Sequence, residues 1–229
     1  MIAIGLMSGT SLDGIDAVLV RIRPRRRTYA IDLLNFVTCP FEEPLLQRLR
    51  AALPPNTGTV EELAQLHHDL GTAFAEAAKQ ATSDMPIDYV ASHGQTIWHA
   101  GEQHVTLQIG DPFIIRETMQ TTVCYDFRSG DCAAGGHGAP LVPYVDVLVL
   151  GSDEEDRVAV NIGGIANLTS IPRGAGPYDV IAFDSGPGNM LIDAFVRSRT
   201  RGEMPFDRDG ALARAGRVDD AALDAMLAD

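Results

Sequence analysis

The sequence runs twice through the same order of elements, and this repetition constrains the fold more than any other feature. In each cycle two short apolar runs flank a turn of small polar residues, a pattern typical of a β-hairpin. The first hairpin joins residues 2–7 to 17–22, and the second joins 157–162 to 167–171. Each hairpin is followed by a strand that ends in polar residues and glycines. We therefore expect an α/β fold of two related lobes, with both hairpin turns facing a cleft.

The clearest helix signal lies in the first cycle. Apolar residues recur at three- and four-residue steps over 60–82, among them Leu66, Leu70 and Phe74. Thr59 precedes this pattern and is a suitable N-cap. The other expected elements are a helix over 42–53, strands over 29–37, 88–92, 105–109, 121–126 and 178–183, a glycine-rich stretch over 128–143 and a helix over 190–199.

The two expected lobes differ in length. The first spans 1–155 and the second 156–229, so the second has fewer than half as many residues. Its last segment, 219–229, has an acidic, alanine-rich helix pattern with no terminating glycine or proline. We interpret the second lobe as incomplete and the chain as truncated at its C-terminus.

Charge and composition argue against several functions. The chain has 18 Lys and Arg against 31 Asp and Glu, a net charge of −13. The electrostatic field of such an acidic protein repels the phosphate backbones of DNA and RNA, so nucleic-acid binding is disfavoured. A single nucleotide can still bind, because backbone N–H groups and Mg²⁺ neutralise its phosphates. No apolar run reaches the roughly 20 residues that a membrane span needs. The N-terminal residues lack a signal-peptide pattern, so we expect a cytoplasmic protein.

The turn of the first hairpin has the composition of an anion-binding loop. Gly9 and Gly14 relax the backbone, so that successive N–H groups can converge on a phosphate. Asp13 and Asp16 fit beside a hydrated Mg²⁺ or as acceptors that stabilise the turn. The loop lacks the lysine of a Walker motif, and an ordinary polar hairpin explains the same residues. The other residues of this turn are Ser8, Thr10, Ser11, Leu12 and Ile15.

The turn of the second hairpin contains Gly163 and Gly164, between Asn161 and Asn167. A pair of glycines is weak evidence for phosphate binding, because many hairpins use one for a positive φ. Its position in the cycle matches that of the first turn, and we therefore regard it as a second candidate phosphate loop.

Asp184 is the candidate catalytic residue. It follows the apolar residues 180–183 and precedes a glycine-rich turn. A carboxylate at the C-terminal end of a strand is well placed to act as a general base in an α/β protein. A turn acceptor or N-cap for the next helix is the alternative.

Polar residues also follow the strands expected over 88–92 and 121–126. His93 can hydrogen-bond a polar substrate, and Arg128 can either clamp a substrate carboxylate or form a structural ion pair. The histidine spacings fit no common zinc site, and no GxSxG elbow supports a Ser–His–Asp triad. The candidate substrate-binding residues of these two regions are Ser92, His93, Gln95, Thr96, Asp126, Arg128 and Asp131.

Taken together, these motifs closely resemble those of the anhydro-N-acetylmuramic acid kinases, a family of the actin/hexokinase-type superfamily. Several long runs in one order are far more specific than a single glycine-rich loop. The matching runs are GLMSGTSLDGID (5–16), SHGQTIWH (92–99), QIGDP (108–112), DFRSGDCAAGGHGAPLVP (126–143), NIGGIANLT (161–169), FDSGPGNMLIDAF (183–195) and FDRDGA (206–211).

The resemblance implies two ribonuclease-H-like lobes around a nucleotide cleft, and an enzyme that uses ATP with Mg²⁺. It implies that water opens the 1,6-anhydro bridge of anhydro-N-acetylmuramic acid and that O6 is phosphorylated, in peptidoglycan recycling. Asp184 would accept the proton of the water. The turns at 9–16 and 161–167 would bind the ATP phosphates, and residues of 92–96 and 126–131 would line the sugar pocket. A homodimer is also implied.

Two departures from the family pattern affect this interpretation. His137 stands where the family usually has glutamine, which keeps a hydrogen-bonding side chain but changes local contacts. Family members also continue with a glycine-rich segment that holds adenosine, and nothing here matches it. A catalytically silent sugar- or nucleotide-binding remnant is therefore the alternative function. A related sugar or acetate kinase is disfavoured, because the FDSGPGN run would have no role in phosphorylating an open sugar.

Overall fold

The computed structural model describes residues 1–9, 12–26, 28–55, 57–83 and 85–228. Thr10 and Ser11 of the first candidate phosphate loop lie outside these ranges. The chain forms two compact units, Met1–Val149 and Leu150–Asp229, where the sequence suggested a boundary at 155/156. Within the described residues, no helix is both long enough and apolar enough to cross a membrane.

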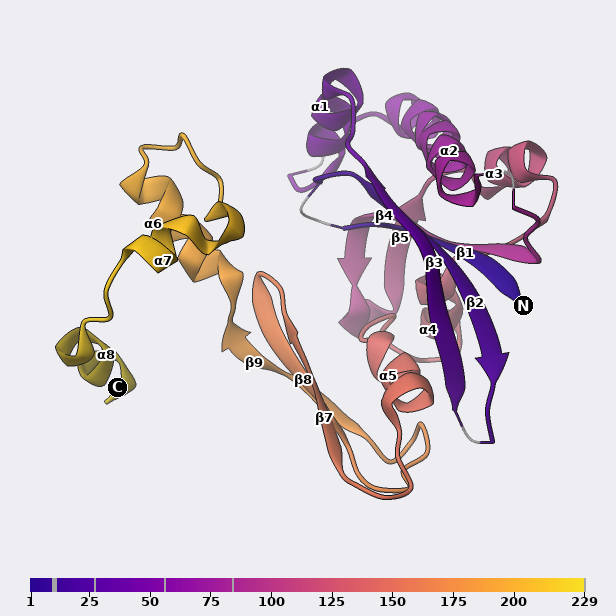
Figure 1. The fold of residues 1–229 in the computed structure, drawn as a ribbon. Coiled ribbons are helices and arrows are strands. Elements are labelled where there is room, and N and C mark those ends of the chain that lie inside the picture. The colour runs from indigo at the N-terminus through magenta and orange to yellow at the C-terminus, as the bar shows by residue number, and fades with distance from the viewer. Residues whose placement is uncertain (10–11, 27, 56, 84, 229) are drawn as a thin grey trace. The chain divides into compact units, whose positions relative to one another are not determined.

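The described residues of the first unit form a six-stranded mixed sheet (Figure 1). Its strands are β1 (Ile2–Ser8), β2 (Ile15–Pro24), β3 (Tyr29–Cys39), β4 (Tyr89–Ala100), β5 (Val105–Ile109) and β6 (Thr122–Tyr125). The strand order is β3-β2-β1-β4-β5, and β6 also pairs with β4. β1, β2 and β3 are antiparallel neighbours, whereas β4 runs parallel to both β1 and β6. The expected first hairpin is therefore confirmed, as β1 and β2.

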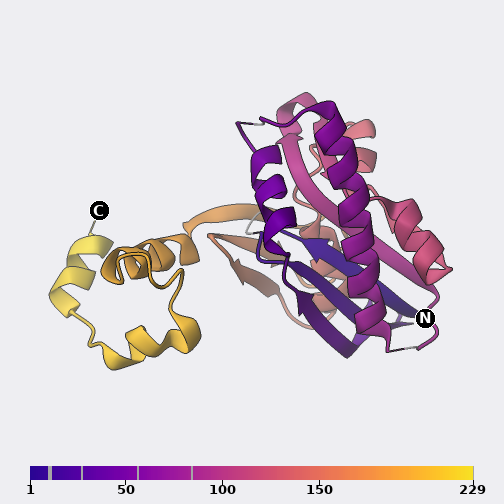
Figure 2. The ribbon, with the colours of Figure 1, turned by 90° about the horizontal axis from the view of Figure 1, so that it is seen from above.

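The helix α2 (Val60–Thr82) spans the residues that the apolar pattern predicted, and it lies along one face of the sheet (Figure 2). Thr59 caps it with a capping box, in which Thr59 and Glu62 each bond the other's backbone N–H. Leu70 and Phe74 are fully buried in the core that α2 shares with β1 and β2. The other helices of this unit are α1 (Glu43–Ala52), α3 (Pro112–Met119), α4 (Phe127–Ala133) and α5 (Val142–Leu150).

One expectation for the first unit was wrong. The strand expected over 88–92 continues to Ala100, so residues 92–96 lie inside β4. Gly94 has φ +70°, and a Cβ there would lie 2.7 Å from the carbonyl oxygen of Ile109, so this glycine permits a close passage within the strand rather than ending it. The glycine-rich stretch 128–143 contains most of α4 and the start of α5.

The second unit contains a three-stranded antiparallel sheet in the order β7-β8-β9 (Figure 1). Its elements are β7 (Arg157–Ile162), β8 (Ile165–Ile171), β9 (Ile181–Pro187), α6 (Asn189–Arg199), α7 (Ala211–Ala215) and α8 (Asp220–Leu227). The strand expected over 178–183 in fact begins at Ile181 and continues to Pro187. A proline is tolerated there because β9 is an edge strand. Asp184 therefore lies within a strand and not after its end.

Candidate functional site

Three parallel strands bring polar segments to one edge of the first unit's sheet. Leu6 of β1 pairs with Ser92 of β4, and Ser92 pairs on its other side with Tyr125 of β6. The segments that follow these positions are the first hairpin turn, the His93 region and the Asp126 region. The C-terminal ends of parallel strands are the usual position of ligand sites in α/β sheets. β1 and β6 end here, whereas β4 continues to Ala100. The topology therefore gathers three of the sequence motifs at one place.

Ser8 connects two of these segments. Its hydroxyl oxygen lies 2.6 Å from Oε1 of Gln95 and 3.0 Å from the carbonyl oxygen of Gly14. Ser8 and Gln95 are both buried. Gly14 has φ +149°, and a Cβ there would lie 2.5 Å from the carbonyl oxygen of Cys39, so the turn requires glycine at this position.

Among the other described residues of the first turn, some side chains are buried in the core and others are exposed to solvent. The N–H of Leu12 donates to the carbonyl of Gly9 at 3.2 Å, and the side chains of Leu12 and Ile15 belong to the hydrophobic core. Asp16 is exposed, and its Oδ1 accepts a hydrogen bond from Oγ1 of Thr38 at 2.6 Å. Two residues of the candidate phosphate loop thus anchor the turn, while Asp16 presents its carboxylate to solvent.

His93 and Arg128 form a hydrogen-bonded pair. Nδ1 of His93 lies 2.9 Å from the carbonyl oxygen of Gly94, to which it donates, and Nε2 accepts from Nε of Arg128 at 2.9 Å. Arg128 also donates from Nη1 to the carbonyl of Gly138 at 2.7 Å. Desolvation and the nearby Arg128 charge lower the pKa of His93, although its bond to Gly94 opposes them. The imidazole is therefore held neutral, with its proton on Nδ1.

The carboxylates beside Arg128 do not pair with it. Oδ2 of Asp131 accepts from the N–H of Gly138 at 2.7 Å, and Asp126 is exposed at φ +62°. Within the described part of the chain, no ion pair joins Arg128 to Asp126 or Asp131. The structural ion pair that the sequence left open is thus replaced by the bond from Arg128 to His93.

A small cavity of about 130 Å³, with several polar residues in its lining, lies beside this pair. Two buried oxygens of its lining residues, Oγ of Ser92 and Oε1 of Gln108, have no hydrogen-bond partner among the described residues. Gln108 is held by its amide nitrogen, which donates to Oγ1 of Thr96 at 3.2 Å. The residues that line the cavity are His67, Ser92, His93, Gly94, Gln108, Ile109, Gly110, Pro112, Tyr125 and Asp126.

His67 is a site residue that sequence reasoning did not identify. Its Nδ1 accepts from the N–H of Gly110 at 3.1 Å, and its carbonyl accepts from the N–H of Asp111 at 3.0 Å. His67 thus fixes the turn of the QIGDP motif at the cavity wall. No local signal reveals this role, because the partner lies 43 residues further along the chain.

In the second unit, the glycine turn is bonded to the start of α6. The carbonyls of Gly164 and Gly163 accept from the N–H groups of Gly188 and Asn189, both at 2.8 Å. Nδ2 of Asn189 also donates to the carbonyl of Ile162 at 3.0 Å. These bonds hold the turn against the start of α6. A phosphate would be bonded by N–H groups of the turn, because carbonyl oxygens cannot donate a hydrogen bond.

Asp184 lies opposite Asn167 in the β8–β9 register, and Asn161 lies opposite Asn167 in the β7–β8 register. The side chain of Asp184 is exposed. Ser185, which follows it, donates to the carbonyl of Ala166 at 3.1 Å. The candidate base Asp184 and the two asparagines of the second turn therefore occupy paired positions on the three adjacent strands β9, β8 and β7.

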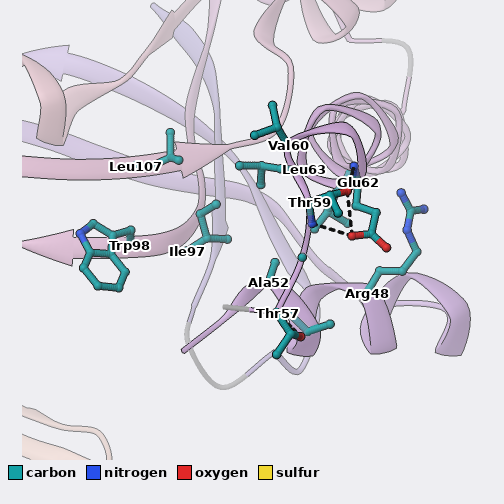
Figure 3. A pocket seen from close by; sticks show the side chains of 13 residues that line it. Arg48, Ala52, Thr57, Thr59, Val60, Glu62, Leu63, Ile97, Trp98 and Leu107 are labelled. Atoms are coloured by element: carbon teal, nitrogen blue, oxygen red, sulfur yellow. Dashed lines mark hydrogen bonds between the residues drawn. The ribbon is translucent and has the colours of Figure 1, made fainter. Parts of the chain in front are cut away.

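A larger cavity of about 440 Å³ is lined by residues of α1, α2, the segment between them, β4 and β5 (Figure 3). Its walls are mostly apolar and include Trp98. Its charged residues are already engaged, because Arg48 pairs with Asp69 at 2.6 Å and Glu62 belongs to the α2 cap. None of the sequence-predicted site residues lines it. The hydroxyl of Thr57 also bonds within the chain, to the carbonyl of Ala51. Because its polar side chains are engaged in this way, the larger cavity is a weaker candidate for the chemistry than the smaller one.

No group of three or more His, Cys, Asp or Glu side chains in the described ranges is arranged to hold a metal ion. Such a group is not needed for every metal, because Mg²⁺ is often held by one or two carboxylates together with substrate phosphates.

Comparison with known proteins identifies relatives of the whole chain. The family model described as anhydro-N-acetylmuramic acid kinase matches residues 1–229. A protein of Caldanaerobacter subterraneus named anhydro-N-acetylmuramic acid kinase is 44% identical over 241 residues, covering 100% of this chain and 61% of the relative. Proteins of the same name from Bacillus thuringiensis and Bacillus cereus are 41% and 42% identical, covering 97% and 93% of this chain and 60% and 58% of the relatives. The chain thus spans about three fifths of the length of these relatives.

Proposed function

Because this chain belongs to the anhydro-N-acetylmuramic acid kinase family, we propose that the protein is an ATP-dependent kinase of 1,6-anhydro-N-acetylmuramic acid. It opens the anhydro bridge with water and phosphorylates O6, which gives N-acetylmuramic acid 6-phosphate for peptidoglycan recycling in the cytoplasm. The observation that carries this proposal is the family match over residues 1–229. The gathering of three polar motifs at one sheet edge supports it.

The fold that we propose is a pair of ribonuclease-H-like lobes around a nucleotide cleft, with residues 1–155 in the first lobe and 156–229 opening the second. In its support, the first unit has an antiparallel meander, β3-β2-β1, followed by the parallel strands β4 and β6. The second unit begins with a comparable antiparallel meander, β7-β8-β9. A homodimer, with small-molecule substrates and no nucleic acid or membrane partner, completes the proposal.

The ATP phosphates are bound by the turns at 9–16 and 161–167. In the first turn, the exposed carboxylates of Asp13 and Asp16 provide the hard oxygen ligands that suit a hydrated Mg²⁺. When bound with ATP, Mg²⁺ supplies charge neutralisation on the phosphates. The bond from Thr38 orients the Asp16 carboxylate, and Ser8 holds the turn against β4. Asp13 and Asp16 thus contribute negative charge toward Mg²⁺, and Thr38 and Ser8 contribute by holding the turn in position.

Asp184 serves as the general base. It accepts a proton from water as the water oxygen attacks the anomeric carbon, and the bond from that carbon to O6 breaks. The released O6 then attacks the γ-phosphate of ATP, and ADP leaves. The exposed position of Asp184 on β9 supports this role, because water and sugar can reach its carboxylate.

The sugar is bound by polar residues within β4 and by those that follow β6. His93 and Arg128 are already bonded to one another, so a sugar hydroxyl or carboxylate meets a pre-formed pair. The other contacts of this pocket are assigned to Ser92, Gln95, Thr96, Asp126 and Asp131.

The test is product analysis after incubation with ATP, Mg²⁺ and 1,6-anhydro-N-acetylmuramic acid in ¹⁸O-labelled water. A phosphorylated sugar with one label on its anomeric oxygen is expected, because water supplies that oxygen. If residues 1–229 alone give no product, the same assay is run on these residues joined to the C-terminal part of the Caldanaerobacter relative. Absence of product there overturns the proposal and favours a sugar- or nucleotide-binding protein without catalytic activity.

A further inference from the structure

β3 leaves one edge of the first unit's sheet open. Among the described strands, β3 pairs with β2 alone and stands at the end of the strand order. An open edge presents unpaired N–H and carbonyl groups that can recruit another strand, and natural proteins usually protect it with lysine, proline or a bulge. Residues 29–33 contain no lysine and no proline, and their register with β2 is regular.

The hydrogen bonds of β2 show which backbone groups of β3 face this edge. The N–H of Ile22 donates to the carbonyl of Met1 at 2.8 Å, and the carbonyl of Ile22 accepts from the N-terminal amine at 3.2 Å. Ile22 therefore bonds toward β1, and its cross-strand neighbour Ile31 forms a non-hydrogen-bonded pair with it. The N–H and carbonyl of Ile31 thus point to the open edge. The same alternation directs those of Tyr29 and Leu33 there.

Beyond Leu33 the chain protects its own edge. The register between β2 and β3 shifts after this residue, as in a β-bulge. The N–H of Phe36 donates to Oδ1 of Asn35 at 2.9 Å. A bulge and a side-chain acceptor both interfere with pairing to another strand. The part of β3 that remains open is therefore 29–33, which we call the open segment.

The side chains beside this edge are apolar. Tyr29, Ile31 and Leu33 alternate along β3 onto one face of the sheet, and they are 41%, 44% and 66% exposed. Exposed apolar residues that occur singly are ordinary, but a continuous strip marks an interaction surface. Their neighbours on β2 extend the strip by one row and are Pro24, Ile22 and Val20.

Charge argues for a second copy of this chain as the occupant. A net charge of −13 opposes association of two copies over most surfaces, but residues 21–27 include five arginines and no acidic residue. Across the β2–β3 ladder, Arg23 lies opposite Ala30, and it forms an ion pair with Asp32 at 2.8 Å. An acidic and a basic group thus lie two positions apart beside the open edge, which is an arrangement that can complement itself.

We infer that two copies of this chain pair through their open segments, antiparallel about a two-fold axis at Ile31. Ile31 then lies opposite Ile31 of the second copy, and Tyr29 lies opposite Leu33. The two apolar strips become continuous. This inference names the surface of the homodimer that belongs to the proposed function, and it rests on that function in this respect.

The same register satisfies the charges. Asp32 comes to lie opposite Ala30 of the second copy, whose small side chain leaves room for Arg23 on the adjacent strand to reach across. Each Asp32 is then placed between arginines of both copies. Because the strands run antiparallel, the basic hairpin tips with Arg25 and Arg26 point in opposite directions and do not repel one another.

Sedimentation equilibrium of the protein tests the surface. The parent is expected to be a dimer. Leu33→Lys should weaken self-association at least about tenfold, because a lysine of each copy would be buried in the apolar strip without a counter-charge. Val60→Lys, which replaces an 85% exposed apolar residue of α2, is the matched control and should stay within about twofold.

Cysteine cross-linking tests the register and does not depend on a disruptive variant. In Ile31→Cys, the two new thiols lie on a hydrogen-bonded pair whose Cα atoms are about 5.5 Å apart, within the range of a disulfide. Mild oxidation should therefore link the two copies through this residue, which peptide mass analysis distinguishes from links through the native cysteines. Leu33→Cys is the matched control: two copies of residue 33 would be about 13 Å apart and should not link.

A monomeric parent overturns the inference. So does a dimer that persists in Leu33→Lys without any link in Ile31→Cys, because its interface then lies elsewhere. Equal linking of the two cysteine variants overturns the antiparallel register. The kinase assay is independent of these outcomes: a dimer that passes both tests but gives no phosphorylated sugar, alone or with the C-terminal part of its relative, refutes the proposed function and leaves the interface standing.

Discussion

The hydroxyl of Ser8 lies 2.6 Å from Oε1 of Gln95, across the parallel pair β1 and β4. Both side chains are buried, and Ser8 also reaches the carbonyl of Gly14. A hydroxyl carries one proton, so Ser8 can donate to only one of these oxygens at a time. This contact joins the first hairpin turn to the SHGQT motif, two segments that lie 87 residues apart.

Replacing Ser8 with alanine should destabilise the first unit. The substitution leaves Oε1 of Gln95 buried without its donor, which costs about 1–3 kcal/mol. Urea denaturation followed by fluorescence of Trp98, in the first unit, measures this change. Ser198→Ala, at an exposed position of α6, is the control and should stay within about 0.5 kcal/mol. Equal stability of the Ser8 variant and the parent would show that the contact carries no energy.

Gly14 and Gly130 should respond in opposite ways to alanine. At Gly14, φ is +149° and a Cβ would lie 2.5 Å from the carbonyl oxygen of Cys39, so we expect Gly14→Ala to cost more than about 1 kcal/mol. At Gly130, inside α4, a Cβ would meet no atom within 4 Å. Gly130→Ala should be neutral or stabilise the unit by up to about 1 kcal/mol, through helix propensity. Urea midpoints compare the two, and similar losses would contradict the argument.

The neutral state of His93 predicts a pH dependence of stability. Desolvation lowers the pKa of His93 in the folded protein from its usual 6.5. As the pH falls below about 6.5, the unfolded chain binds a proton at this position that the folded chain does not, so stability decreases until the lowered folded pKa is reached. Protonation there also removes the acceptor for Arg128.

His93→Gln should reduce this pH dependence, because glutamine does not titrate. The measurement is the urea midpoint of both proteins at about pH 7.5 and 5.5, a range that brackets the usual histidine pKa. The parent should lose more stability than the variant between the two values. His68→Gln, at an exposed position of α2, is the control for the other histidines. An identical pH slope in the parent and the His93 variant would refute the prediction.

Elements with a regular apolar pattern could be predicted from the sequence. The bounds of α2 and its Thr59 cap agree with the prediction because apolar spacing and capping residue point to the same helix. The strands β5 and β7 were also obtained with their observed bounds. The hairpin turns were placed correctly because small polar residues separate clearly apolar runs.

The remaining elements depend on long-range contacts that the local pattern does not contain. Gly94 resembles a turn residue in the sequence, but its neighbour Ile109 shows that it allows a close approach within β4. The glycine-rich run after Phe183 resembles a turn in the sequence, yet it continues β9 as far as Pro187. In the site, the partner of His67 and the unpaired oxygen of Gln108 become apparent only when β4, β5 and α2 are brought together.

Asp184→Asn should reduce turnover strongly while leaving sugar binding almost unchanged. The amide keeps the size of the carboxylate but cannot accept the proton of the attacking water, and a general base contributes about 10²- to 10⁴-fold to rate. Steady-state kinetics give kcat, and titration with the anhydro sugar gives Kd. Asp224→Asn, an exposed carboxylate on α8, is the matched control and should retain full activity. Turnover at the parent rate would remove Asp184 from the role of base. A large loss of sugar affinity without a loss in kcat would instead make it a binding residue, since the substitution would then have removed an interaction made equally in the ground and transition states.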